Sequence, residues 1–551
     1  MNKRMNKGIG YASVLTLFIC AALLAWRAGA GAQAPAVPPG QQPAAAGGRP
    51  GGGGGGRGGA ALTLYNQSCA DCHGTTDGKA ARAPSLFDER WLKGTTDDKI
   101  AAAIRNGVRN TEMDAFTPAQ VTDDQIFQLI AFIRTTSSTL IPKPEFVPDA
   151  EGQVIASEKQ RFKIEVVTKG VETPWGLAFL PDGRLLVTER PGKLRIVDKT
   201  GKLSDPVKGT PTPHVQQDGG YLDVTVHPQY ARTGWVYLSY SEVRPGFTPP
   251  PAEPAPAPPE AAAPARGGRG RGPQIPSNTV IVRGKINANN EWTDQQVIYR
   301  VPDDLYVAGG THFGSRFIWD RTNHLFFSFG ERGTMLNAQD LKNPLGKIHR
   351  VNDDGSVPRD NPFVNRADAL PSIWSYGHRN PQGFAWDPIT GKLWESEHGP
   401  SGGDEINIIE PGHNYGWGVI SHGVQAGITA RPRAGMESPI VYFTPSIGPS
   451  GIAFYTGTRY PGWRNSSLFV SGLVGQQLRR LEVKDGKVTH QEVLFAQFGR
   501  VHGLTTGPDG YFYVAVQNPT AGTTGIPMAA STPGQIMRLV PVAAAAAAKK
   551  K

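Results

Sequence analysis

The sequence contains little cysteine and little charge. Only three of its 551 residues are cysteine, which excludes a framework of structural disulfides. Charged residues make up 19% and hydrophobic residues 39%, so most of the chain can build folded cores. The 68 Gly and 47 Pro exclude a compact all-helical protein but suit a large all-β domain with many turns. The net charge of +10 is dispersed, partly in tail segments, so we expect no nucleic-acid partner.

Residues 1–34 have the pattern of an export signal. Three basic residues precede the apolar run "VLTLFICAALLAW", and "AGAQA" offers small residues before a cleavage after Ala34. Two alternatives stay open. The apolar run 9–26 is almost long enough to remain as a membrane anchor, and "LFIC" resembles a lipoprotein signal at Cys20. All three place the rest outside the cytoplasmic membrane, which predicts a periplasmic protein that meets the membrane only if this segment stays uncleaved.

Composition divides the rest of the chain into ordered and low-complexity parts. Residues 35–60 and 244–273 are rich in Ala, Pro and Gly and cannot bury enough apolar surface to fold. We therefore expect a disordered linker and a disordered insertion there, and a disordered tail at 542–551. The ordered parts are predicted to be a helical domain at 61–139, a proline-containing connector at 140–157 and a β-rich domain at 158–541.

Helical periodicity predicts the small N-terminal domain. "TDDQIFQLIAFIRTT" places apolar side chains on one face of a helix, and Thr122 with Gln125 forms a capping-box pattern at its start. "TTDDKIAAAIRNG" predicts a second helix that ends at Gly107. A domain of fewer than about 80 residues builds only a small core, so it needs an additional cross-link or cofactor.

The sequence "CADCH" offers such a cofactor site. Cys69 and Cys72 can bond covalently to the two vinyl groups of one haem c, and His73 can coordinate the iron. Met113, the only methionine in this domain, lies before the last helix and is the candidate second axial ligand. A redox dithiol or half of a zinc site are the alternatives for the cysteines, and a core position is the alternative for the methionine. With this order of motifs, residues 61–139 resemble the small class I-like cytochromes c, whose His/Met ligation suits electron transfer.

From about residue 158 the pattern changes to short β-runs separated by polar turns. An apolar run, a turn and a second apolar run recur six times, in "GLAFLPDGRLLVTE", "YLDVTVHPQYARTGWVYLSY", "SRFIWDRTNHLFFSFG", "GFAWDPITGKLWESE", "GIAFYTGTRYPGWRNSSLFVS" and "GLTTGPDGYFYVAV". None of these hairpins could cover both of its faces alone, whereas radial stacking would bury them. We therefore predict an all-β six-bladed β-propeller behind the small all-α cytochrome c domain. A pair of β-sandwiches is the alternative.

Polar residues gather in the loops of this domain, in "GGTHFGS", "YGHRNPQG", "SEHGPSGGDEIN", "HNYGWG" and "GRVHGL". Loops at one end of a propeller converge on its central channel, so these could build a pocket. By residue type, His312, Arg379, Glu405 and Arg500 are candidates for an anion- or metal-binding site. Ordinary turn chemistry is the alternative for each of them.

Five longer stretches carry a family resemblance. "TPWGLAFLPDGRLLVTER", "AQDLKNPLGKIHRVNDDGSVPRDNPF", "IWSYGHRNPQGFAWDP", "EHGPSGGDEINIIEPGHNYGW" and "GPDGYFYV" run in order between about residues 174 and 540. They resemble the soluble quinoprotein aldose-sugar dehydrogenases of the glucose/sorbosone dehydrogenase family. The resemblance implies a six-bladed propeller that binds pyrroloquinoline quinone (PQQ) and Ca²⁺ and oxidises aldoses at C1 to lactones.

The resemblance also implies roles for particular residues. His312 matches the general base that removes the proton of the anomeric hydroxyl. Arg379 and Asn380 match residues that hold the quinone, and Arg500 matches an arginine that pairs with a PQQ carboxylate. The positions that match the calcium ligands are the carbonyls of Gly399, Pro400 and Tyr415 and the carboxylate of Glu405.

Five positions depart from the family pattern. Asp218 stands where Gln is usual and Thr311 where Asn or Asp is usual, and both remain candidate PQQ contacts. Val474 replaces a lysine, and His502 replaces the second arginine of a pair at the cofactor. An expected aromatic residue aligns near Ala426. Two cationic contacts to an anionic cofactor are therefore weakened or lost.

Together these patterns predict a periplasmic fusion enzyme. The propeller would oxidise a small-molecule aldose with PQQ and Ca²⁺, and electrons would pass one at a time to the haem and then to a respiratory acceptor, either a cytochrome or an oxidase. A tethered cytochrome provides a high effective concentration of acceptor. One alternative is a propeller without PQQ that serves as a carbohydrate-binding or interaction module beside an electron-carrying cytochrome. Another is a different substrate, such as sorbosone or another aldehyde hydrate.

Overall fold

The computed structural model describes residues 59–248, 275–400, 402–425, 432–519 and 533–542. The predicted export signal, the linker up to residue 58, most of the predicted insertion, Ala426 and all but the first residue of the predicted tail lie outside these residues. Within them, no helix combines the length and the apolar character needed to cross a bilayer.

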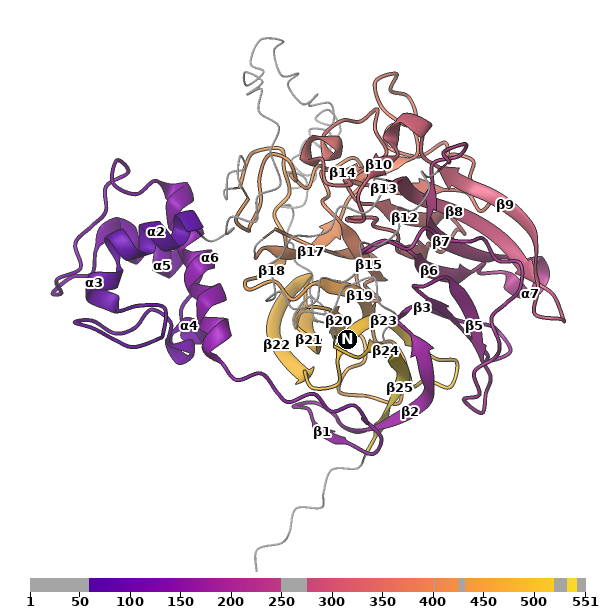
Figure 1. The fold of residues 1–551 in the computed structure, drawn as a ribbon, viewed down its shortest axis with the longest axis horizontal. Helices are drawn as coiled ribbons and strands as arrows, with labels where there is room; N and C mark the ends of the chain where they lie inside the picture. The colour runs from indigo at the N-terminus through magenta and orange to yellow at the C-terminus, as the bar shows by residue number, and fades with distance from the viewer. Residues whose placement is uncertain (1–58, 249–274, 401, 426–431, 520–532, 543–551) are drawn as a thin grey trace, which may run out of the picture. The chain divides into compact units, whose positions relative to one another are not determined.

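The N-terminal described part is helical (Figure 1). The structure confirms both predicted helices, and it confirms the capping box between Thr122 and Gln125. Gly107 follows the first of them with a φ of 69°, a left-handed conformation that suits glycine. The helices are α2 (Gly59–Ser68), α3 (Ala70–His73), α4 (Glu89–Gly94), α5 (Asp97–Asn106) and α6 (Asp123–Leu140).

This helical domain has a core of its own. Tyr65 of α2, Ile100 of α5 and Leu129 of α6 are buried in one cluster. Cys69 and Met113 are partly buried and pack against the same cluster. The sequence motif and the methionine loop, 44 residues apart, are thus brought to one core.

The rest of the described chain forms six antiparallel sheets, each of which is one blade. Blades one to three are β3 (Pro174–Phe179), β4 (Leu185–Glu189) and β5 (Lys193–Val197); β6 (Tyr221–Val226), β7 (Val236–Val243) and β8 (Pro276–Ile286) with β9 (Trp292–Arg300) and β10 (Val307–Ala308); and β11 (Phe317–Trp319), β12 (Leu325–Phe329), β13 (Lys347–Val351) and β14 (Ile373–Tyr376). Blades four to six are β15 (Pro381–Trp386), β16 (Leu393–Glu397), β17 (Asp404–Ile409) and β18 (Val441–Phe443); β19 (Pro449–Phe454), β20 (Ser467–Gly472), β21 (Gln477–Lys484) and β22 (Lys487–Phe495); and β23 (Arg500–Thr506), β24 (Phe512–Gln517) and β25 (Pro533–Pro541) with β2 (Arg161–Glu172) and β1 (Val154–Ala156). Short helices α7 (Tyr230–Thr233), η1 (Asp303–Leu305) and η2 (Met335–Ala338) lie in the connections.

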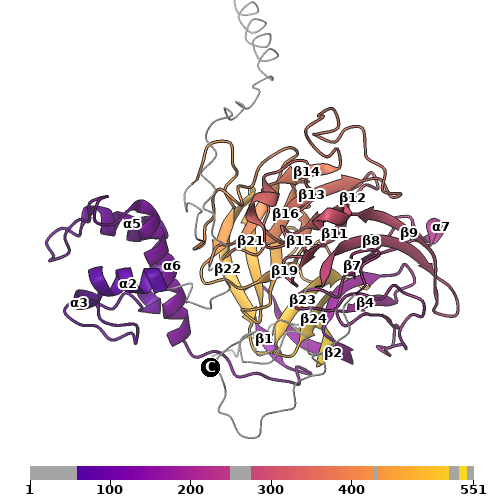
Figure 2. The ribbon, with the colours of Figure 1, turned by 45° about the horizontal axis from the view of Figure 1, so that its top comes forward.

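The six blades close into a ring. The first strand of each blade contacts the first strand of the next, in the order β3, β6, β11, β15, β19, β23 and back to β3 (Figures 1 and 2). Each of the six predicted hairpins supplies the first two strands of one blade. The prediction of a six-bladed propeller is confirmed. The alternative of paired sandwiches is wrong, because two packed sheets have no such closed ring.

The last blade joins the two ends of the domain. Strand β2 pairs with β25 along its whole length, from Phe162 opposite Pro541 to Glu172 opposite Pro533. A strand from the beginning of the domain therefore covers the edge that the last strand would otherwise expose. Strand β1 pairs with β2, so the predicted connector 140–157 includes a strand of this blade.

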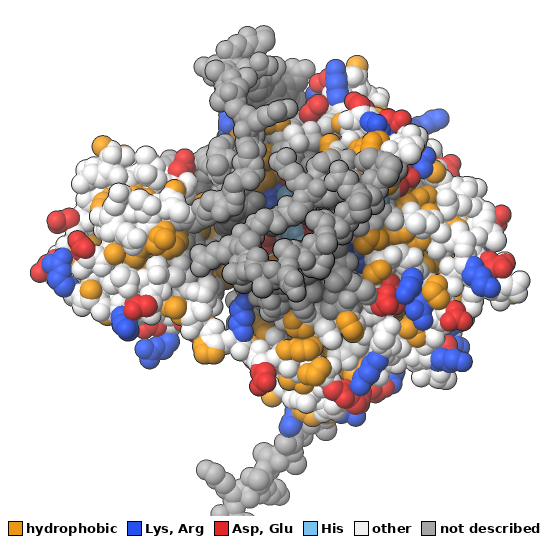
Figure 3. Space-filling model, in the orientation of Figure 1, with side chains coloured by type: hydrophobic (Ala, Val, Ile, Leu, Met, Phe, Trp, Pro, Cys, Tyr) orange, Lys and Arg blue, Asp and Glu red, His pale blue; other side chains and the backbone are white. Residues whose placement is uncertain are grey.

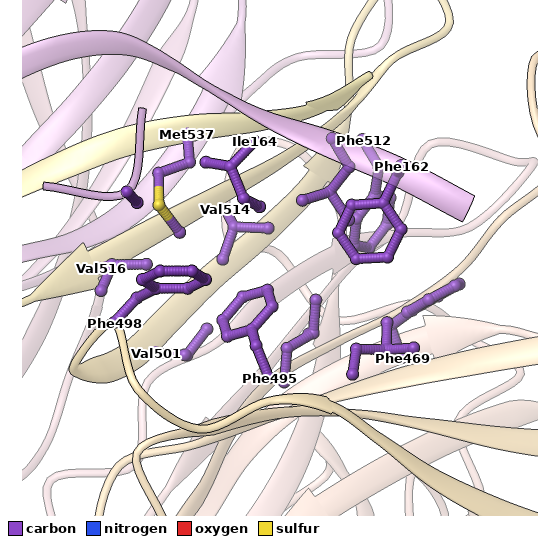
Figure 4. Packing of buried hydrophobic residues seen from close by; sticks show 14 of the residues in the cluster. Phe162, Ile164, Phe469, Phe495, Phe498, Val501, Phe512, Val514, Val516 and Met537 are labelled. Atoms are coloured by element: carbon purple, nitrogen blue, oxygen red, sulfur yellow. The ribbon is translucent and has the colours of Figure 1, made fainter. Parts of the chain in front are cut away.

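Tight apolar packing supports this closure. Phe162 and Ile164 of β2 lie against Phe512 and Val514 of β24 and Met537 of β25 (Figure 4). All five side chains are fully buried. Burying aromatic and branched side chains is worth about 1.5–3 kcal/mol each, so this cluster stabilises the ring as a whole.

Candidate functional site

The haem motif occupies the end of α2 and the short helix α3. His73 Nδ1 donates a hydrogen bond to the carbonyl of Pro84 at 2.8 Å. Because a carbonyl only accepts, Nδ1 carries the proton and Nε2 keeps its lone pair free. Metal-binding histidines are generally oriented by such a hydrogen bond, donated by the ring nitrogen that does not bind the metal. Cys69, Cys72 and Met113 complete the predicted set, and the donor types fit an iron porphyrin.

The alternatives for the two cysteines fit less well. Burial raises the pKa of Cys69 to about 11, and the neighbouring Cys72 adds to the shift. A redox dithiol needs a lowered thiol pKa instead. A zinc site needs further ligands, and in the described part of the chain no group of three metal-ligating side chains includes either cysteine.

In the propeller, His312 forms a pair with a buried carboxylate. The residue lies in the loop between β10 and β11, and its Nδ1 is hydrogen-bonded to Glu331. The Glu331 side chain is 1% exposed, whereas the His312 side chain retains 17% exposure. The carboxylate therefore fixes the ring and its tautomer, and Nε2 is the nitrogen left to act as a base.

Close contacts between loops hold this pair in place. A Cβ on Gly330 would lie 2.2 Å from the carbonyl oxygen of His312 and 2.8 Å from Asn380 Oδ1. The loops can approach this closely only because the residue between them is glycine. The guanidinium of Arg332 donates to the carbonyl of Thr311, the residue before the histidine. The base loop is thus fastened from two sides.

Four predicted residues surround one buried imidazole, two by contact and two through their charges. Arg379 donates to the carbonyl of His398 at 3.0 Å, and Asn380 Nδ2 lies 3.2 Å from His398 Nδ1. Burial, with smaller contributions from the charges of Arg379, His312 and Arg500, lowers the pKa of His398 to about 3. His398 is therefore neutral, and the structure brings the predicted base and both predicted arginines into one electrostatic environment.

The charge of Asp218 acts on three arginines from different blades. Burial lowers the pKa of Arg332 and of Arg500 to about 10 and also lowers that of Arg190, and the charge of Asp218 opposes the shift in each case. All three side chains are at most 7% exposed. The charge of Glu331 also acts on Arg332. Two carboxylates cannot neutralise three guanidinium groups, so this cluster has an excess of positive charge that suits a polycarboxylate such as PQQ.

Three of the four predicted calcium positions line one small cavity. Gly399, Glu405 and Tyr415 line it, together with Arg379. Pro400 does not line this cavity. The Pro400 carbonyl instead accepts a hydrogen bond from the hydroxyl of Ser446 at 3.2 Å. Near the centre of the propeller face in Figure 3, basic, acidic and histidine side chains are all visible.

The carboxylate in this cavity is electrostatically crowded. Burial raises the pKa of Glu405 well above its usual range, and the neighbouring charge of Glu397 adds to the shift. A divalent cation would relieve this cost, and carboxylate and carbonyl oxygens are the ligands that Ca²⁺ prefers. The residues present fit calcium.

The departures from the family pattern have visible structural consequences. His502 Nε2 lies 2.8 Å from Gln517 Oε1, and its ring packs 4.6 Å from the indole of Trp175. Burial lowers the pKa of His502 well below its usual value, so it is neutral and cannot replace an arginine. Val474 is 45% exposed and offers no charge.

Comparison with known proteins identifies the family. Residues 171–524 match the family model described as glucose/sorbosone dehydrogenase. The chain belongs to the glucose/sorbosone dehydrogenase family. A separate model, described as cytochrome c oxidase, cbb3-type, subunit III, matches residues 58–133, so this family member carries an N-terminal cytochrome c domain.

Relatives and solved structures agree with this assignment. Aldose sugar dehydrogenase YliI of Escherichia coli is 36% identical over 360 residues, which cover 64% of this chain and 89% of the relative. The apo crystal structure of the soluble aldose sugar dehydrogenase of Escherichia coli is 33% identical, with a TM-score of 0.58 over 69% of this chain and all of that chain. The PQQ-bound aldose sugar dehydrogenase of Streptomyces coelicolor is 25% identical, with a TM-score of 0.51 over 71% of this chain and all of that chain.

The structure of this glucose/sorbosone dehydrogenase family member adds three residues that the sequence analysis missed. Glu331 orients the predicted base, and Arg190 and Arg332 extend the cationic cluster around Asp218. A signal for them was present, because an "ER" pair stands at or just after the end of two predicted hairpins, at Glu189–Arg190 and at Glu331–Arg332. Residues near the end of the second strand of different blades lie at the same end of a propeller.

Proposed function

We propose that this chain oxidises an aldose at C1 to its lactone with PQQ and Ca²⁺ and passes the electrons to its own haem c. The observation that supports this most is the pair His312–Glu331, held in one electrostatic environment with Arg379 and Arg500. The PQQ-bound state of the Streptomyces coelicolor relative supports the choice of cofactor.

The base performs the proton transfer. Nε2 of His312 accepts the proton of the anomeric hydroxyl, and the carboxylate of Glu331 stabilises the imidazolium that results. When bound, PQQ supplies the hydride acceptor, Ca²⁺ a Lewis acid and haem c a one-electron carrier. Proton transfer to Nε2 requires that Glu331 hold His312 in the correct tautomer. Glu331 is therefore a positioning residue rather than a second base.

The cofactor is held by positive charge from three blades. Arg500 pairs with a carboxylate of PQQ, and Arg190 and Arg332 supply the charge that Val474 and His502 cannot. Arg379 and Asn380 hold the quinone side. Glu405 and the carbonyls of Gly399 and Tyr415 bind the calcium ion, with Pro400, Asp218 and Thr311 as further candidate contacts.

The helical domain receives the electrons. Cys69 and Cys72 attach the haem, and His73 with Met113 ligates the iron. Oxidation of the aldose to the lactone releases two electrons, and one haem carries one, so each turnover would load the cytochrome twice. A respiratory cytochrome or oxidase outside the cytoplasmic membrane then takes the electrons, which agrees with the export signal predicted at residues 1–34.

A binding experiment tests the cofactor part of this proposal. Haem-loaded, Ca²⁺-saturated protein is titrated with PQQ and binding is followed by equilibrium dialysis. Arg500→Gln should weaken binding by about 10–100-fold, since a charge-assisted hydrogen bond is worth about 1.5–3 kcal/mol. Arg366→Gln, at an exposed arginine paired with Asp368, should leave binding as in the unmodified protein. Equal affinities for both variants would contradict the proposed arginine site.

The neutral His502 and the uncharged Val474 favour one second function, a propeller that binds carbohydrate without PQQ. The same titration separates the two. Uptake of PQQ at micromolar concentration supports the dehydrogenase, whereas sugar binding without PQQ uptake supports the binding module.

A further inference from the structure

Blade four and the loop before it carry three buried side chains to which the proposed reaction assigns no role, those of His378, Glu395 and Glu397. Glu395 and Glu397 lie on one face of β16, because residues two apart in a strand point the same way. The strand pairing places Asn407 opposite Glu395, and Glu405 opposite Glu397. His378, in the loop before β15, lies with its Nδ1 3.5 Å from Glu397 Oε1.

The ligand atoms of three of these residues converge. One atom each from His378, Glu395 and Glu397 lies within 4.8 Å of the other two, a spacing that one metal ion can bridge. The three side chains are 0%, 0% and 3% exposed. None of them is among the four calcium positions implied by the family resemblance.

The imidazole is prepared as a ligand. His378 Nε2 is hydrogen-bonded to Ser375 Oγ at 2.9 Å, whereas its buried Nδ1 has no hydrogen-bond partner. One ring nitrogen held by a neighbour and the other left free is the arrangement found in metal-binding histidines. Glu395 Oε1 is also buried without a hydrogen-bond partner. Two unpartnered polar atoms in one fully buried group point to a missing ligand rather than to a finished hydrogen-bond network.

The charges lead to the same conclusion. The amide of Asn407 donates to Glu395 at 3.1 Å and to Glu397 and Glu405 at 3.3 Å. The backbone N–H of Arg379 donates a further hydrogen bond to Glu397 at 2.7 Å. Like charges opposite each other in a sheet destabilise it, and neither amide donor carries a compensating charge. A dication beside Glu395 and Glu397 would balance both of their charges.

We propose that His378, Glu395 and Glu397 bind a divalent transition-metal ion, of which Zn²⁺ is the example, at a centre separate from the calcium position. An imidazole nitrogen with two carboxylates suits Zn²⁺, whereas Ca²⁺ prefers oxygen ligands throughout. Glu397 also lines the neighbouring small cavity, so a water there could complete the coordination. The centre ties the loop before β15, which carries Arg379, to strand β16.

Metal analysis of the full-length, haem-loaded protein tests the stoichiometry. After treatment with a chelator, the protein is dialysed against Zn²⁺ in excess Ca²⁺, and zinc is measured relative to haem iron. We expect one zinc per chain. His378→Gln and Glu395→Gln should each weaken binding by more than about 100-fold, because changes outside the ligand sphere already cost about 10–100-fold. Ser375→Ala should fall in that smaller range.

The chain offers a matched control. His413 and Glu437 form an exposed pair with 2.8 Å between Nδ1 and Oε1. His413→Gln should retain the zinc. Zinc that persists in His378→Gln and Glu395→Gln, or is lost in His413→Gln, overturns the assignment.

Two further measurements keep the proposal testable if a variant folds poorly. Zinc-edge anomalous diffraction from the unmodified protein should give a peak bounded by His378 Nδ1, Glu395 and Glu397. A peak only beside Glu405 and Tyr415, or none, overturns the proposal. Zinc should also raise the melting temperature of the unmodified protein, and Glu395→Gln should abolish that rise. If protons alone neutralise the cluster, zinc will not raise the melting temperature, and the proposal is wrong.

Discussion

The helical domain and the propeller present their reactive groups in opposite ways. In the helical domain, Cys69, Cys72 and His73 are neighbours in sequence, and a short stretch of chain holds the whole motif. In the propeller, His312 and Arg500 are almost 190 residues apart and come together only because the ring is closed. A covalent cofactor site thus depends on local structure, whereas a pocket in a propeller channel depends on the stability of the entire ring.

The largest expected effect comes from removing the haem-binding cysteines of the helical domain. Cys69→Ala combined with Cys72→Ala should remove all covalently bound haem, because no thiol remains to form a thioether. Pyridine haemochrome spectra of the denatured protein measure this. The melting transition of the propeller should be unchanged. Covalent haem in the double variant would contradict the assignment of the motif.

The next effect concerns the propeller alone. His312→Gln should lower the rate of sugar-dependent haem reduction by about 10²–10⁴-fold, the usual contribution of a general base. The haem spectrum itself should be unchanged, since the variant lies in the other domain. His490→Gln, at an exposed histidine paired with Glu158, serves as the control. Turnover that survives in His312→Gln shows that the base is another group.

A pair of core variants tests whether stability is separate in the two domains. Ile164→Ala, at a fully buried residue of β2, should destabilise the propeller by about 2–5 kcal/mol, and Leu129→Ala should do the same to the helical domain. Denaturant unfolding followed by tryptophan fluorescence and by the Soret band should show one transition shift in each variant. A common shift of both transitions would contradict the separation.

The smallest effect, measured per pH unit, is a dependence of stability on pH. Burial lowers the pKa of His349 to about 3, so the folded protein keeps this ring neutral while the unfolded chain takes up a proton near pH 6.5. The free energy of unfolding of the propeller should therefore fall as pH decreases from 6.5 towards 3, by at most about 1.4 kcal/mol per pH unit from this group. His349→Gln should flatten that slope. An unchanged slope between pH 6 and 4 would show that other groups dominate.

Much of the fold could be predicted because its signals are local. The short apolar run "LFFSF" and the capping box at Thr122 each specify an element within a few residues. The pairing of β2 with β25 joins residues about 370 apart and has no local signal. The predicted β-rich domain therefore begins at residue 158, after the strand β1 that the structure shows. In the sequence, Glu395 is one position of a predicted strand. Only the pairing of that strand with β17, which sets Glu395 opposite Asn407, places it near the other carboxylates.

The two-centre mechanism is tested most directly by stopped-flow spectroscopy. Haem-loaded protein, reconstituted with PQQ and Ca²⁺, is mixed with an aldose while the haem α-band is followed at several protein concentrations. The predicted result is haem reduction that requires both PQQ and sugar, with a rate constant independent of protein concentration, because donor and acceptor share one chain. Iron-loaded protein that takes up no PQQ in saturating Ca²⁺, or whose haem stays oxidised when sugar is added, would contradict the mechanism.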